Sequence, residues 1–134
     1  MATIDVSTGM TLEYDIRGEG EPILFVMGLA GQLIDWPEDF VDLFADEGFM
    51  TIRYDNRDIG LSTQTDWEPP TQQKVLGAML RRRPVKDVGY TVEDMAADGA
   101  ALLEALGIES AHIVGMSMGG MITQAMAINH PSKV

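Results

Sequence analysis

Hydrophobic and polar residues alternate along the first part of the chain, and this pattern predicts a β-hairpin. The alternation covers residues 3–6 and 11–17, with Ser7-Thr8-Gly9 between them as a turn. Residues 23–26 show a different pattern, because all four are apolar and turn-forming residues precede them. Such a short apolar run is typical of a strand that is buried on both faces of a parallel sheet.

After a glycine-containing loop, the spacing of the apolar residues changes to that of a helix. Pro37 suits the first helical position, Gly48 suits the end, and apolar residues recur between them: Phe40, Val41, Leu43 and Phe44. Residues 49–54 are then expected to form a strand. Residues 55–90 show the least regularity, with a short apolar stretch at 75–80, and we expect an irregular segment there.

Regular structure is predicted again from Thr91 onward. Thr91 and Asp94 resemble a capping box at the start of a helix, and Gly107 suits its end. The apolar face of this helix comprises Val92, Met95, Leu102, Leu103 and Leu106. A strand at 111–114 and a helix at 119–129 follow. This alternation of strands and helices predicts parallel β-α-β units and an α/β fold.

Length and composition are those of an ordinary globular domain, and we expect one domain over residues 1–134. The formal net charge of −12 argues against nucleic acid or an anionic membrane as the main partner. The start of the chain lacks the basic and apolar regions of a signal peptide, and no apolar run is long enough to span a membrane. We therefore expect a cytoplasmic protein without a membrane partner.

One stretch departs from this acidic composition. Residues 73–86 contain no acidic residue but five basic ones: Lys74, Arg81, Arg82, Arg83 and Lys86. A solvated loop face explains such a run, and a local contact with an anion or a protein is the alternative.

The clearest chemical signal is Gly115-Met116-Ser117-Met118-Gly119, which matches G-x-S-x-G between a predicted strand and a predicted helix. In this setting the serine occupies a sharp, strained turn that exposes its Oγ. Glycines on both sides avoid clashes with the neighbouring strand and helix. The amino end of the following helix points its N–H groups toward the place where an oxyanion would develop.

The G-x-S-x-G motif is the last of three blocks that occur in a familiar order. The blocks are residues 25–31 (Phe-Val-Met-Gly-Leu-Ala-Gly), 54–62 (Tyr-Asp-Asn-Arg-Asp-Ile-Gly-Leu-Ser) and 113–120 (Ile-Val-Gly-Met-Ser-Met-Gly-Gly). With them the chain resembles the N-terminal half of an α/β-hydrolase, close to the esterase and methylesterase-like branch. The resemblance implies an incomplete α/β-hydrolase fold, with an N-terminal hairpin, a mostly parallel sheet of about five strands and flanking helices.

The resemblance also implies roles for individual residues. Ser117 would be the nucleophile, and the backbone N–H groups of Leu29 and Met118 would form the oxyanion hole. Gly28, like Gly115 and Gly119, would permit a tight turn. The family usually has His-Gly where this chain has Met27-Gly28. The oxyanion role uses the main chain, so this substitution leaves it possible.

The second block is expected to serve structure. Arg57 would fix a turn by donating to carbonyl groups, Asp55 would accept from backbone N–H groups, and Gly60 would permit a positive φ. This interpretation gives the block no direct part in catalysis.

The triad of this family runs Ser, then Asp or Glu, then His, and the chain does not supply the last two. No acidic residue follows Ser117, and the histidines are His112 and His130. Along a strand and a helix these lie on the order of 16 and 20 Å from Ser117. Both are expected to be structural. The strand 111–114 would also be an unprotected sheet edge, so we expect a homo-oligomer or a complementary C-terminal half as partner.

The sequence therefore predicts a serine hydrolase acting on a small carboxylic ester or related acyl substrate, without a cofactor or a metal. The alternative is a catalytically inactive, half-length protein that associates through its exposed sheet edge. Cofactor-free haloperoxidase-like or carbon–carbon bond hydrolase chemistry uses the same elbow and stays open.

Overall fold

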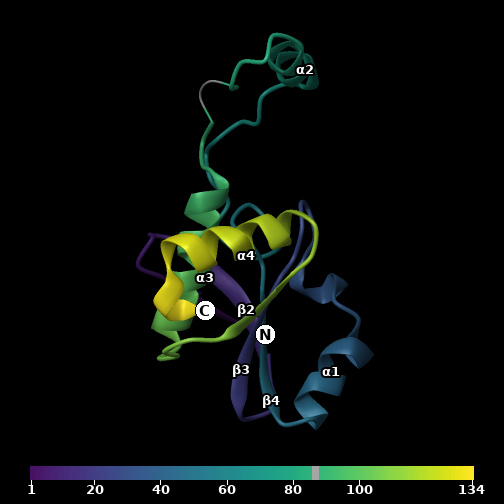
Figure 1. The fold of residues 1–134 in the computed structure, drawn as a ribbon, viewed down its shortest axis with the longest axis vertical. Coiled ribbons are helices and arrows are strands. Elements are labelled where there is room, and N and C mark those ends of the chain that lie inside the picture. The colour runs from purple at the N-terminus through teal and green to yellow at the C-terminus, as the bar shows by residue number, and fades with distance from the viewer. Residues whose placement is uncertain (86–87) are drawn as a thin grey trace.

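The computed structural model describes residues 1–85 and 88–134 and contains a five-stranded sheet (Figure 1). The strand order is β1-β2-β4-β3-β5. The strands are β1 (Ala2–Asp5), β2 (Thr11–Arg17), β3 (Glu21–Val26), β4 (Phe49–Tyr54) and β5 (His112–Gly115). The predicted hairpin is β1 and β2, and β5 lies at an edge, as expected.

Parallel pairing is confined to one half of the sheet. Strand β3 pairs in parallel with β4 on one side and with β5 on the other, with Val26 opposite Tyr54 and Gly115. Strand β2 pairs antiparallel with both β1 and β4. The sheet is therefore mixed, and its parallel part brings the carboxyl ends of β3, β4 and β5 to one edge.

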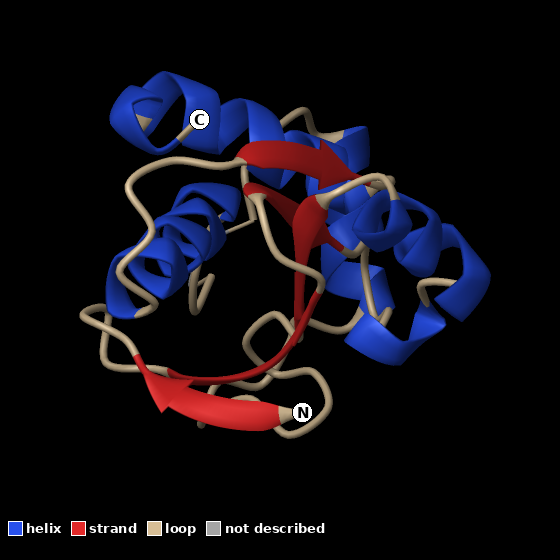
Figure 2. Cartoon of the chain, turned by 90° about the horizontal axis from the view of Figure 1, so that it is seen from below, coloured by secondary structure: helices blue, strands red, loops and turns tan. Residues whose placement is uncertain are grey.

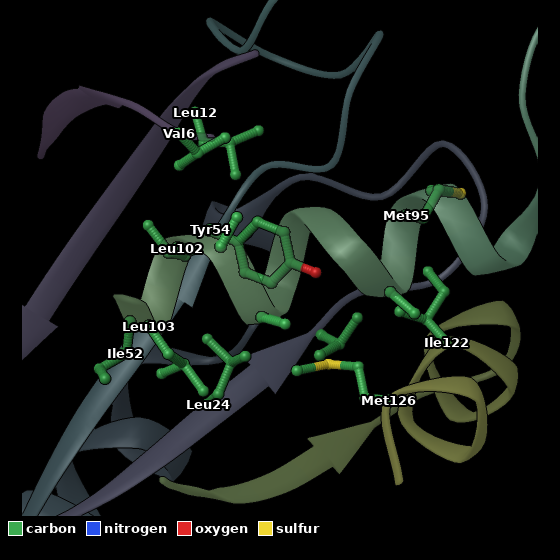
Figure 3. Packing of buried hydrophobic residues seen from close by; sticks show 14 of the residues in the cluster. Val6, Leu12, Leu24, Ile52, Tyr54, Met95, Leu102, Leu103, Ile122 and Met126 are labelled. Carbon is green, nitrogen blue, oxygen red and sulfur yellow. The ribbon is translucent and has the colours of Figure 1, made fainter. Parts of the chain in front are cut away.

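Three helices cover the two faces of this sheet: α1 (Glu38–Asp46), α3 (Val92–Ala105) and α4 (Met118–Asn129). Figure 2 shows helices on both sides of the strands. Successive side chains of β3 point to opposite faces of the sheet. Leu24 and Val26 pack with α3 and α4 on one face. Ile23 and Phe25 pack with α1 on the other face. The larger cluster includes Tyr54, Leu102 and Met126 (Figure 3).

The helix boundaries follow local signals in the sequence. Helix α3 has the expected capping box, in which Thr91 Oγ1 accepts from the Asp94 N–H and the Asp94 carboxylate accepts from the Thr91 N–H. Helix α1 begins after Pro37. Short 3-10 turns lie at Leu33–Asp35 and Pro131–Lys133.

The expectation of an irregular segment over residues 55–90 was wrong for its middle part. Residues Gln72–Leu80 form helix α2, and Thr71 Oγ1 accepts a hydrogen bond from the Lys74 N–H at its start. Figure 1 shows α2 standing away from the body of the molecule at the end of a long excursion. None of its residues is buried, so no apolar face revealed the helix in the sequence.

Candidate active site

Ser117 lies between β5 and α4, at the carboxyl edge of the parallel strands, and its backbone is strained. Its φ is 56° and its ψ is −120°, a conformation that residues with a side chain rarely adopt. The residue is exposed. The expected sharp turn is therefore present, with the serine side chain accessible to solvent.

The two glycines of the motif are required by close backbone packing. A Cβ on Gly115 would overlap the carbonyl of Gly119 and the Thr123 hydroxyl. A Cβ on Gly119 would overlap the carbonyl of Val26 at the end of β3. Helix α4 thus starts directly against β3, which only glycine permits.

The loop after β3 packs against the same turn. A Cβ on Gly28 would lie 2.9 Å from the Met116 carbonyl oxygen and 3.0 Å from Ser117 Cβ. It would lie 3.6 Å from the Met118 nitrogen. The Met116 N–H donates to the Val26 carbonyl at 3.1 Å, which fixes β5 against β3. The structure therefore brings together the loop of Gly28 and Leu29 and the turn of Ser117 and Met118.

The backbone N–H groups at the start of α4 differ in whether they have a hydrogen-bond partner. In the first turn of α4 the N–H groups of Gly119 and Gly120 donate to the carbonyls of Met116 and Ser117. The Met118 N–H has no backbone partner among the described residues. The first turn of α4 carries no acidic side chain, so nothing there offsets the positive end of the helix dipole. Leu29, on the facing loop, has a side chain that is 79% exposed.

Side chains of the second sequence block, residues 54–62, hold the loop after β3 in place by hydrogen bonds. Asp55 Oδ1 accepts from the Leu33 N–H at 2.6 Å, as expected of Asp55, and Gly60 has a φ of 54°. Asn56, which sequence reasoning had not singled out, donates from Nδ2 to the Met27 carbonyl at 3.1 Å. Both polar side chains are buried. They hold the loop whose backbone approaches Ser117.

Arg57 donates to a carboxylate and, within residues 1–85 and 88–134, to no carbonyl group, so that prediction was wrong. Its Nε and Nη2 each donate at 2.7 Å to the carboxylate of Asp98, a buried residue of α3. The hydrogen bond to Asp98 raises the pKa of Arg57. The guanidinium also lies 5.1 Å from the ring centre of Tyr90. Asp98 is the seventh residue of an alanine-rich helix, and nothing in the sequence around it indicates that it pairs with Arg57.

Neither histidine is placed near Ser117. His112 lies at the amino end of β5, where its Nε2 is 3.0 Å from Glu21 Oε1. His130 follows the far end of α4, and its N–H donates to the Met126 carbonyl at 2.7 Å. Within residues 1–85 and 88–134, both histidines therefore lie at the ends of β5 and α4 that are remote from Ser117.

Other kinds of site find little support in the part of the chain that the structure describes. It contains no group of three or more His, Cys, Asp or Glu residues arranged to hold a metal ion. No helix within it is long and apolar enough to cross a membrane. Lys86 of the predicted basic run lies outside the described residues.

Comparisons with known proteins agree with this geometry. The family model for the alpha/beta hydrolase fold matches residues 21–134. BpoC of Mycobacterium tuberculosis, which carries a provisional name as a non-heme bromoperoxidase, is 32% identical over 93% of this chain. The rhodomycin D methylesterase DauP of Streptomyces sp. is 32% identical over 84%. The chain spans 39% and 32% of the lengths of these two relatives.

Solved structures show the same fold. Est816, described as an N-acyl homoserine lactone degrading enzyme, matches 99% of this chain with a TM-score of 0.75 and 27% identity. The chain covers 42% of Est816. The epoxide hydrolase VrEH1 from Vigna radiata matches 99% of the chain with a TM-score of 0.77 at 19% identity. At that identity the likeness to VrEH1 shows the fold alone.

Proposed function

Because this chain belongs to the α/β-hydrolase family, we propose that it carries the nucleophile and the oxyanion-binding part of a serine hydrolase. The observation that carries the proposal is the strained backbone of Ser117, which has a φ of 56°. The glycines on either side of it, Gly115 and Gly119, have no room for a side chain. Strain of this kind persists only where the surrounding structure holds it, and it is common at sites of chemistry.

In the proposed reaction the Ser117 Oγ attacks an acyl carbon. Its proton passes to a base as the new carbon–oxygen bond forms, and the carbonyl oxygen becomes an oxyanion. The backbone N–H groups of Leu29 and Met118 donate to that oxyanion, helped by the amino end of α4. Collapse of the intermediate expels the alcohol, and water then releases the acid. Support comes from the approach of Gly28 to Ser117 and Met118.

We propose that the base and its acidic partner come from polypeptide outside residues 1–134, such as a complementary C-terminal half. Support for this comes from the positions of His112 and His130, which are at the far ends of β5 and α4. The relatives are also more than twice as long as this chain. A serine without a base is a poor nucleophile at neutral pH, so residues 1–134 alone should turn over little.

A carboxylic ester is the proposed substrate class. Among the relatives, one is named a methylesterase and another is described as a lactone-degrading enzyme. Esters and lactones share the acyl–oxygen bond that an activated serine and an oxyanion hole can break. The exposed apolar side chains of Leu29 and Met116, on the loop and the turn that meet here, favour an apolar acyl group.

A fluorophosphonate probe tests the nucleophile. The probe should label Ser117 in a polypeptide that joins residues 1–134 to a C-terminal half of hydrolase type, and Ser117→Ala should abolish labelling. Ser110→Ala, a change at another exposed serine, should leave labelling intact. Absence of a Ser117 adduct in the joined polypeptide would reject the assignment.

The second candidate is a catalytically inactive protein that keeps the turn as scaffold and associates through the edge of β5. The lack of a histidine near Ser117 in the described chain favours it. This candidate predicts no ester hydrolysis by the joined polypeptide and no effect of Ser117→Ala. Ester hydrolysis that disappears with Ser117→Ala would exclude it.

A further inference from the structure

The excursion that carries α2 has a charge opposite to that of the rest of the chain. We call residues 71–85 the arm. The arm contains four cationic residues and no acidic one, namely Lys74, Arg81, Arg82 and Arg83. Since the whole chain carries −12, the remainder is more negative still. Elsewhere among the described residues the cations of Arg17, Arg53 and Arg57 are already paired with carboxylates.

The arm also contains a cavity. Its volume is about 710 Å³, and its cationic lining comes from Lys74, Arg81 and Arg83. Gly77, Ala78, Pro84 and Val85 add small or apolar surface, and Thr71 and Gln73 complete the lining. None of these cationic side chains has an ion-pair partner among the described residues. The cavity therefore suits a ligand that presents carboxylates around an apolar group.

The body of the same chain presents such a surface on α1. Asp39, Leu43 and Asp46 recur at helical spacing on one exposed face, and Glu47 follows them. Leu43 is 63% exposed although it is apolar. Asp39 and Asp46 have no ion-pair partner in the described chain, in contrast to Glu38 and Asp42 on the same helix. We call this surface the α1 acidic face.

We propose that the cationic cavity of the arm binds the α1 acidic face of a second copy of this chain. One molecule cannot make this contact with itself, because α1 and α2 lie toward opposite ends of its longest axis (Figure 1). Two copies in antiparallel orientation satisfy both contacts at once and form a closed dimer. Nucleic acid and anionic membranes fit less well, since the acidic body repels them.

Sedimentation velocity on residues 1–134 at low and high salt provides the first test. The dimer should form at micromolar concentration at low ionic strength. Its dissociation constant should rise about tenfold or more in ~0.5 M salt, because the contact depends on charges near the surface. A monomer at every concentration up to about 100 μM in low salt would overturn the proposal. So would an association that salt leaves unchanged in a chain carrying Met121→Lys with Ile128→Lys, which removes exposed apolar side chains from α4.

A charge swap gives the decisive test. Arg81→Glu with Arg83→Glu should weaken the dimer about tenfold or more, and Asp39→Lys with Asp46→Lys should do the same. An equimolar mixture of the two variants should recover association, because both arm–α1 contacts of the mixed dimer are then complementary, whereas both contacts of each variant's own dimer join like charges. Failure of the mixture to recover it would overturn the proposal, and so would binding of the arm to phosphatidylserine vesicles without any dimer.

Matched controls separate the cavity from general charge effects. Arg82→Glu makes half the charge change of the arm variant at a position outside the cavity lining. Glu104→Lys with Glu109→Lys makes the same charge change as the α1 variant, at exposed positions in the last turn of α3 and just after it. Both controls should shift the dissociation constant far less than the cavity and α1 variants. Equal shifts would reject the cavity as the contact. All the altered side chains are exposed, so circular dichroism should report unchanged folding.

Discussion

At the scale of single residues, the position of Ser117 depends on how closely α4 approaches β3. Gly119→Ala would place a Cβ against the Val26 carbonyl, whereas Gly120→Ala would place one 3.6 Å from the Gly115 oxygen, an ordinary contact. We expect Gly119→Ala to lower the free energy of unfolding by about 1–3 kcal/mol. Gly120→Ala should raise it by roughly 0.5–1 kcal/mol, since alanine favours a helix.

Urea denaturation of both variants measures this difference. The pair is matched, because the same methyl group is added at adjacent positions of one helix. Equal changes in stability would mean that the contact between Gly119 and Val26 does not hold the turn in solution.

Features of single residues could be predicted from the sequence where they depend on residues close by in the chain. The strained turn at Ser117 and the carboxylate of Asp55 as an acceptor of a backbone N–H follow from spacing and residue type. The pairing of Arg57 with Asp98 does not, because the two residues are 41 positions apart and meet only through the packing of α3. Long-range polar pairs leave no periodic pattern in a sequence.

At the scale of elements, a network of charges joins β2, β4 and α1. The buried Arg53 of β4 binds Asp15 of β2 and donates at 3.1 Å to Glu38 of α1. Arg17 of β2 also contacts Asp15 and Glu38. Burial alone would raise the pKa of Asp15, but the hydrogen bond and charge of Arg53, together with Arg17, hold it below its usual value.

This network predicts a particular response to acid. The lowered pKa means that Asp15 stabilises the fold fully above about pH 4, the ordinary aspartate value, and less as the pH falls below it. Asp15→Asn should lower stability at pH 7 and also reduce its loss between about pH 5 and pH 2. Urea denaturation across this range tests the expectation, with the exposed Asp66→Asn as control. An unchanged acid response in Asp15→Asn would contradict it.

The base of the excursion that carries α2 is held by contacts between its two ends. Asp58 accepts from the Thr65 N–H and hydroxyl, and Tyr90 lies 5.4 Å from Trp67 in an edge-on arrangement. Burial, followed by the hydrogen bond to Asp58, raises the pKa of Tyr90 to about 12. A raised tyrosine pKa means that this contribution to stability is present below about pH 10 and lost as the pH rises through 12.

Absorbance titration of tyrosinate tests this contact. The difference between the parent chain and Tyr90→Phe should show one group with a midpoint near pH 12. In urea the same difference should move to about pH 10, the value of an unperturbed tyrosine. A midpoint near 10 in the folded protein would show that Tyr90 does not donate to Asp58.

At the scale of the whole molecule, the fold class and the order of elements could be read from the sequence, and the outward excursion could not. Strands with buried faces and helices with one apolar side carry periodic patterns, as in β3 and α3. Helix α2 has no buried residue, so its sequence carries no apolar face of that kind. Within the candidate active site, only the parts formed by the backbone and by glycines could be predicted from the sequence.

Helix α4 exposes apolar side chains beside the edge strand β5. Met121 and Ile128 are 57% and 75% exposed, and an unpaired strand edge with apolar surroundings favours association.

In ~0.5 M salt, which screens the arm–α1 contact, residues 1–134 should still show a concentration-dependent mass above 14.6 kDa. Met121→Lys with Ile128→Lys should reduce this mass without loss of stability. Light scattering measures it, with Gln124→Lys on the same helix as control, and an unchanged mass in the double variant would exclude this surface.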